Sequence, residues 1–188
     1  NALADNDASA AAGTFYAMME EDISGNISSG HATLDVGNIS LTATATGNGG
    51  TADASIDNIY ADAESNANAT VTIGDITLTA TANGNGGDAS ATMDEIYAAA
   101  TDNANATVTI GNISLTANGG VEAQATISSI YASAASNAEA HLTIGDITLN
   151  ATATEAGGNA TATISEYIFA SADSKDRKST RLNSSHLG

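Results

Sequence analysis

The stretch of sequence that decides the fold reads TVTIGDITLTATANGNGG over residues 70–87. Apolar and hydroxyl side chains alternate strictly up to Ile73, and after the pair Gly74-Asp75 the alternation resumes at Ile76. Strict alternation puts apolar side chains on one face of a β-strand and polar side chains on the other. The stretch therefore predicts two strands that meet at a two-residue corner, which brings their apolar faces into register with each other.

This pattern recurs along most of the chain. The first kind of unit carries its corner glycine at positions 37, 74, 111 and 145, at spacings of 37, 37 and 34 residues. Between these units lies a second kind with the same alternation, which contains Tyr60, Tyr97 and Tyr131 in its clear copies and Tyr167 in a looser one. A fixed period in this range indicates a solenoid or an array of repeats.

Two architectures satisfy the alternation. In a parallel β-solenoid successive units stack along one axis, whereas in an antiparallel meander the corner is a hairpin turn, for which Gly-Asp is a suitable pair. We favour the solenoid, because the second kind of unit has Asp57-Asn58 where a hairpin needs glycine. Facing strands of a solenoid also cover each other's apolar side chains. The predicted fold is an all-β parallel solenoid of 18–19-residue half-units in a 37-residue repeat, with the meander as the alternative.

The sequence leaves open whether one turn of the coil, here called a rung, spans 18–19 or 37 residues. With 37, equivalent side chains stack about 4.8 Å apart in continuous columns. With 18–19, rows from the two kinds of unit interleave. The similarity of the half-units favours the short rung. We then expect Val71 and Leu78 to face each other in the core while Thr72 and Thr79 face water.

Three segments are expected along the chain. Residues 1–31 form a degenerate first unit, residues 32–174 form the β repeat array, and residues 175–188 form a non-native or disordered tail. In that tail, residues 178–186 resemble a translated sequencing-adapter artefact, and the abrupt change of charge there agrees with this interpretation.

Secondary structure in the first unit is ambiguous. The alanine-rich composition of residues 8–21 suits a short helix. We favour a strand, because Phe15-Tyr16-Ala17 aligns with the later Ile59-Tyr60-Ala61.

Charge is distributed one-sidedly along the chain. All four basic residues lie at or beyond Lys175, whereas all but one of the 22 acidic residues precede it. Such a surface repels phosphate backbones and anionic membranes, so it argues against nucleic-acid binding. Membrane insertion is not expected either, because the sequence has no run of about 18 apolar residues. An acidic surface of this kind suits high ionic strength or divalent cations.

Corner positions of the first kind of unit carry Asn or Asp in every copy. If the solenoid is correct, these side chains form a polar ladder along one edge. Their recurrence reflects either a plain turn preference or Ca²⁺ held between rungs by carboxylate and amide oxygens. Calcium is the only cofactor that the sequence suggests. The candidate ligands are Asn38, Asp75, Asn112 and Asp146.

The sequence predicts no enzyme. His31, His141 and His186 have no Ser and Asp partners at a spacing that implies a triad. Asp94 and Glu95 are neighbours at a corner and point apart, whereas a glycosidase needs carboxylates that face each other across a cleft.

Outward positions after the glycine corner form the most regular surface feature. Two interpretations are open: Thr suits a solvated strand face, or the side chains form a flat hydroxyl grid. The T-x-T pattern resembles that of ice-binding β-solenoids. Ten of the twelve aligned positions are Ser or Thr: Ser40, Thr42, Thr44, Thr77, Thr79, Thr81, Ser114, Thr116, Thr148 and Thr152.

The repeats over residues 8–174 resemble the repeat regions of very large bacterial surface proteins and adhesins, and more loosely curli-type fibre subunits. This resemblance implies an extracellular or cell-surface protein and a non-enzymatic structural role in an adhesin, matrix fibre or surface layer. Expected partners are copies of the same chain or neighbouring repeats, and further candidates are glycans or ice. Ice binding is the alternative function. With a short rung the grid would be interrupted, so we expect no ice activity.

Overall fold

The structure, a computed structural model, describes residues 1–19, 30–64, 66–136 and 138–173. These residues form β-strands and no helix, so the all-β prediction is confirmed. The strands are β1 (Ala2–Ala4), β2 (Ala8–Ala12), β3 (Phe15–Met19), β4 (His31–Val36), β5 (Ile39–Ala45), β6 (Thr51–Ala63), β7 (Asn68–Ile73), β8 (Ile76–Ala82), β9 (Asp88–Ala100), β10 (Ala106–Ile110), β11 (Ile113–Gly119), β12 (Glu122–Ala135), β13 (Ala140–Ile144), β14 (Ile147–Ala153) and β15 (Asn159–Asp173).

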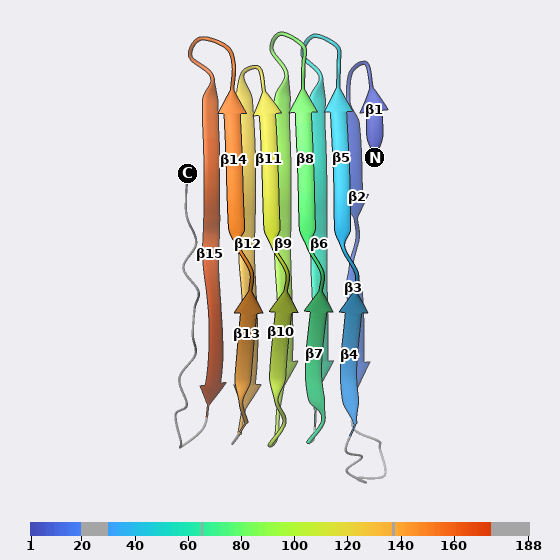
Figure 1. Ribbon diagram of the computed structural model, residues 1–188, viewed down its shortest axis with the longest axis vertical. Helices are drawn as coiled ribbons and strands as arrows, with labels where there is room; N and C mark the ends of the chain where they lie inside the picture. Colours follow the sequence, from blue (N-terminus) through green and yellow to red (C-terminus); the bar gives the residue numbers. More distant parts are fainter. Residues whose placement is uncertain (20–29, 65, 137, 174–188) are drawn as a thin grey trace.

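Each rung consists of two short strands and one long one. In the second rung, β7 and β8 follow each other along one wall of the rod, and β9 returns along the opposite wall (Figure 1). Neighbouring rungs pair through parallel strands in three sheets, ordered β1-β5-β8-β11-β14, β13-β10-β7-β4 and β15-β12-β9-β6-β2, with β3 also on β6. The predicted parallel β-solenoid is therefore confirmed.

One rung spans 37 residues. Thr79 aligns with Thr42 on one side and Thr116 on the other, and Tyr97 aligns with Tyr60 and Tyr131. The expected rung of 18–19 residues is wrong. The two half-units resemble each other because both walls follow the same alternation and the same two-residue interruption, although they lie on opposite sides of the core.

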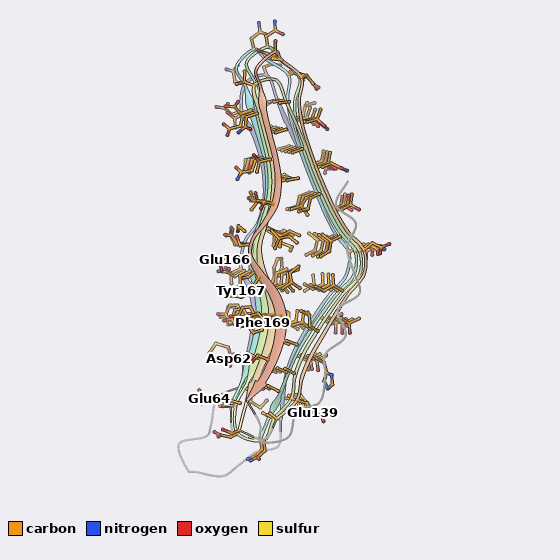
Figure 2. The ribbon with its side chains drawn as sticks, turned by 90° about the vertical axis from the view of Figure 1, so that its left-hand side faces the viewer. Asp62, Glu64, Glu139, Glu166, Tyr167 and Phe169 are labelled. Carbon is orange, nitrogen blue, oxygen red and sulfur yellow. The ribbon has the colours of Figure 1, made fainter. Side chains whose placement is uncertain are left out.

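The Gly74-Asp75 pair bends the wall without reversing the chain (Figure 2). Val71 and Leu78 are both fully buried, but their strands lie in the same wall and both pack against β9. The expectation that these two side chains face each other is therefore wrong. Thr72 and Thr79 are half-buried on the opposite faces of their strands, as the alternation predicts.

The core consists of columns of aligned apolar residues. Val71 lies between Leu34 and Val108 in neighbouring rungs. Alanine dominates the buried set, and the larger fully buried side chains, such as Ile76 and Ile96, cluster around the bends. The two walls consequently lie close together where Ala packs on Ala and further apart at the bends (Figure 2).

The loops between the walls account for the irregular repeat length. Residues 83–87 connect β8 to β9, whereas only residues 120–121 connect β11 to β12, which shortens the 37-residue period to 34. Gly86 in the longer loop has a φ of 75°, a backbone conformation that favours glycine. The described part of residues 1–31 continues the stack, because β3 pairs with β6 and Tyr16 aligns with Tyr60. The strand favoured there is confirmed, and residues 175–188 lie outside the described residues.

Candidate functional site

The predicted hydroxyl positions come together as a continuous grid on the sheet of β5, β8, β11 and β14. Neighbours along a strand are two residues apart, about 6.6 Å, and neighbours across strands are about 4.8 Å apart. Every position is exposed or half-buried. The three columns are Ser40-Thr77-Ser114-Thr148, Thr42-Thr79-Thr116-Asn150 and Thr44-Thr81-Asn118-Thr152.

This sheet carries no charged side chain. Of the ten acidic residues in the described strands, Asp35 lies in β4 and the other nine lie on the opposite wall. Within the strands, nearly all carboxylates therefore lie on one wall, a feature that the sequence reasoning missed, while the corner residues Asp75 and Asp146 lie on the other wall. The nine residues on β6, β9, β12 and β15 are Asp53, Asp57, Asp62, Asp88, Asp94, Glu95, Glu122, Glu166 and Asp173.

The corner residues form the predicted polar ladder. The backbone N–H groups of Asp75, Asn112 and Asp146 each donate a hydrogen bond to the side-chain Oδ1 of the corner residue one rung earlier. The distances are 2.8 Å from Asp75 to Asn38, 2.8 Å from Asn112 to Asp75, and 3.0 Å from Asp146 to Asn112. These bonds satisfy backbone groups that the bend leaves out of the strand pairing.

The same contacts account for the recurrence of Asn and Asp at the corner. Oδ1 of Asn38, Asp75 and Asn112 already accepts a backbone hydrogen bond, whereas Ca²⁺ takes six to eight oxygen ligands. Among the described residues, no group of three or more His, Cys, Asp or Glu side chains is placed to hold a metal ion.

We expect Asn112→Ala to lower the free energy of unfolding by about 1 kcal/mol. The substitution removes the acceptor for the N–H of Asp146, and water can replace part of the lost bond because Asn112 is exposed. Urea denaturation followed by circular dichroism measures the effect. Ser114→Ala, an outward change in the same rung, is the control and should have a smaller effect. An equal loss in both variants would contradict a role for the ladder.

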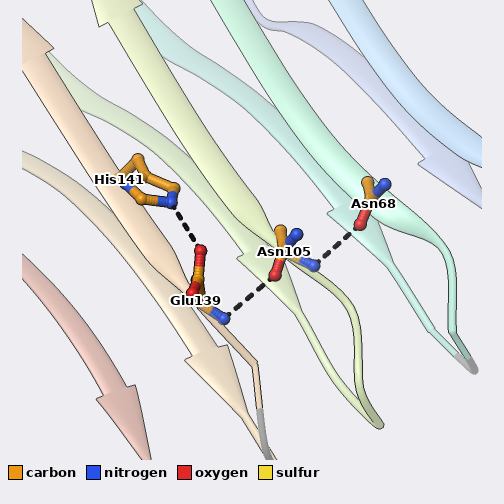
Figure 3. Close-up of polar contacts among 4 residues, drawn as sticks. All are labelled: Asn68, Asn105, Glu139 and His141. Carbon is orange, nitrogen blue, oxygen red and sulfur yellow. Dashed lines mark hydrogen bonds and ion pairs between the residues drawn. The ribbon is translucent and has the colours of Figure 1, made fainter. Parts of the chain in front are cut away.

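A second ladder, which the sequence reasoning did not identify, lies at the start of β7 and just before β10 and β13. The N–H of Asn105 donates to Oδ1 of Asn68 at 2.9 Å, and the N–H of Glu139 donates to Oδ1 of Asn105 at 3.0 Å (Figure 3). His141 Nε2 lies 3.2 Å from Glu139 Oε2, on the exposed surface. His141 aligns with the outward-facing Thr107 of the previous rung. His186 lies outside the described residues.

The acidic wall carries a ladder of aromatic rings, here called the aromatic strip: Tyr16, Tyr60, Tyr97, Tyr131 and Phe169. Successive ring centroids are 5.8, 4.9, 5.0 and 5.5 Å apart, and the planes are inclined by 19° or less. Comparison of the repeats within the sequence did not identify the last member of the strip, Phe169. An irregularity in β15 aligns Tyr167 with Ser129 and brings Phe169 into line with Tyr131.

The strip changes the acidity of its hydroxyl groups. Burial raises the pKa of Tyr97, and the neighbouring Tyr60, Asp62 and Glu95 raise it further. Burial is also the main cause of the raised pKa of Tyr131, to which Glu95 adds as a nearby negative charge and hydrogen-bond partner. Both causes disfavour a tyrosinate within the strip.

We therefore expect stability to fall as the pH rises above about 10, the ordinary tyrosine pKa. Above that pH the unfolded chain loses these hydroxyl protons before the folded chain does, so ionisation favours unfolding. The double variant Tyr97→Phe, Tyr131→Phe cannot ionise at these positions and should lose less stability between pH 8 and pH 11. Urea denaturation at both pH values tests this. The same decline in both proteins would contradict the stated cause.

Comparisons with known proteins find no significant match to any family model, curated protein or solved structure. The described residues contain no helix that could span a membrane.

Proposed function

We propose that this chain is a non-enzymatic structural repeat of an extracellular adhesin, matrix fibre or surface layer. The observation that best supports this role is the residue-for-residue alignment of successive rungs, as in Val71 with Val108 and Tyr60 with Tyr97. Each rung offers its neighbour the same core columns and strand edges. A rod of any length can therefore be built by adding copies of one repeat.

Both ends of the rod leave apolar side chains and strand edges uncovered, and another rung of the same kind would cover them. In the last rung Ile144, Ile164 and Ile168 are only partly buried. The equivalent residues one rung earlier, Ile110, Ile127 and Ile130, are buried. At the opposite end the inward Ala12, Ala17 and Met19 are only partly buried, whereas the aligned Ile56, Ala61 and Ala63 are buried. A neighbouring repeat or a second copy of the chain would cover these side chains and pair with the open strand edges.

Sedimentation velocity and small-angle scattering test this proposal. The chain should associate with increasing concentration, and the particle should lengthen at constant cross-section. Ile168→Lys places a charge on the open end and should suppress association, whereas Thr79→Lys, on the side of the rod, should not. Circular dichroism confirms that both variants fold. A chain that stays monomeric throughout, or equal association in both variants, would contradict the proposal.

Ice binding is the second candidate function, and the 37-residue rung favours it. The expected absence of ice activity rested on the short rung, which would have interrupted the grid. The aligned rungs instead give columns such as Thr42, Thr79 and Thr116 on an uncharged sheet. Methyl and hydroxyl groups at regular spacings of about 4.8 and 6.6 Å can hold an ordered layer of water.

Thermal hysteresis of the full chain tests this candidate. Thr79→Lys places a charge at the centre of the grid and should abolish the hysteresis. Ser90→Lys makes the same kind of change at an outward position of β9 on the opposite wall and should retain it. Absence of hysteresis in the unmodified chain would exclude ice binding and leave the structural role standing.

A further inference from the structure

The aromatic strip presents ring edges to solvent. The rings of Tyr60, Tyr97 and Tyr131 are inclined by only 1° and 2° to their neighbours at about 5 Å, so each ring covers the face of the next. A sugar ring or a bare cation binds aromatic side chains through the ring face. Those faces are occupied along the middle of the strip, so neither class of ligand fits there.

Carboxylates lie on both sides of the strip. Asp62 is two residues beyond Tyr60 on the same face of β6, and Glu95 is two residues before Tyr97 on β9. Both lie close enough to Tyr97 to raise the pKa of its hydroxyl group. Figure 2 shows Asp62, Glu64, Glu166 and Phe169 on the same outer surface of this wall. The strip therefore lies within a strongly negative field.

A lane of short side chains runs beside the rings. Asp62 aligns with Ala99, Ser133 and Ser171 in the following rungs. The tall rings form one side of this lane, and the lane continues parallel to the rod axis. A flat molecule can lie along it against the ring edges.

The chemistry of these groups defines the ligand. The ring edges and the short side chains of the lane form an apolar surface against which a planar aromatic molecule can pack. A positive charge on the same ligand would pair with Asp62 or Glu95, whereas an anionic ligand would be repelled by the carboxylates of this wall. We propose that the aromatic strip and its flanking carboxylates bind a planar, cationic aromatic molecule aligned with the rod axis. Three linked or fused rings would span about two to three rungs at 4.8 Å per rung.

Titration with acridine orange, a planar three-ring cation, tests the proposal on the full chain. We expect saturable binding that weakens as salt is added. Anthracene-2-sulfonate, a planar three-ring anion, should not bind. Tyr97→Leu interrupts the strip at its centre and should abolish the saturable phase, and circular dichroism checks that this variant remains folded.

Two double variants test whether the carboxylates beside the strip contribute specifically or only through the overall negative charge of the wall. Asp62→Asn with Glu95→Gln keeps every ring and should weaken binding by about fivefold, as expected for partly exposed charge pairs. Asp88→Asn with Glu122→Gln removes the same charge from the far end of the wall and should change affinity less than twofold. Equal losses in the two double variants, binding of the anion, or unchanged binding in Tyr97→Leu would each overturn the proposal.

Discussion

Replacing Val108 by aspartate should destabilise the rod by about 3–5 kcal/mol or prevent folding. Val108 has no exposed surface and lies between Val71 and Leu142 in a core built largely of alanine. A carboxylate at this position would be buried without a partner, because every lysine and arginine of the chain lies at or beyond Lys175. Urea denaturation followed by circular dichroism measures the loss.

The matched control is Thr109→Asp, one residue further along β10. Thr109 is half-buried on the outer face, between Thr72 and Thr143. An aspartate there remains hydrated, so the expected change is within about 1 kcal/mol. Equal losses from the two substitutions would contradict the assignment of inner and outer faces.

Deleting one whole rung should shorten the rod and leave it folded. Removal of residues 69–105 joins Asn68 to Ala106, which takes the place of the aligned Ala69. The remaining rungs can then stack in the same register, with a loss of stability that corresponds to one repeat. A cooperative thermal melt at a lower midpoint is the expected result.

Deleting half a repeat should have a much larger effect. Removal of residues 69–86 takes away β7 and β8 and leaves β9 without the wall that covers its apolar side. We expect loss of the cooperative melt. If the rung spanned 18–19 residues, the two deletions would be tolerated equally well. That outcome would refute the rung length.

Strands, inner faces and outer faces could be predicted from the sequence because alternation is a local property. Rung length could not, because a bulky apolar residue, two polar residues and another apolar residue occur in both half-units. Identity at the aligned positions distinguishes the alternatives better: Tyr60 recurs as Tyr97 and Tyr131 at the full repeat, whereas the half-repeat preserves only the polarity pattern. Side chains that stack in a column must match in size and shape, so residue identity indicates the rung length better than polarity does.

Local chemistry also could not fix the role of the Gly74-Asp75 pair. Gly and Asp suit a reversing turn and a bend equally well. The opposite wall decides between them: β9 has 13 residues and faces β7 and β8, which have 6 and 7. Two short strands must therefore continue in one direction to cover one long strand.

The candidate surfaces were only partly predictable for a related reason. All ten hydroxyl positions face outward as expected, but the continuous grid follows from the 37-residue rung and was not expected. The absence of charge from that sheet and its concentration beside the aromatic strip follow from which half-unit forms which wall, and this is a tertiary property. Phe169 joins the strip only because β15 shifts its register by one residue.

Spin labels at Thr79 and Thr116 test the stacking of equivalent residues most directly. The chain contains no cysteine, so Thr79→Cys with Thr116→Cys provides two unique attachment sites. The aligned β8 and β11 place these backbones about 4.8 Å apart, so strong dipolar broadening of the electron paramagnetic resonance spectrum is expected. Labels at Thr79 and Tyr97 lie on opposite walls and should show none. Broadening in the second pair and not in the first would contradict the 37-residue rung and the continuous grid that depends on it.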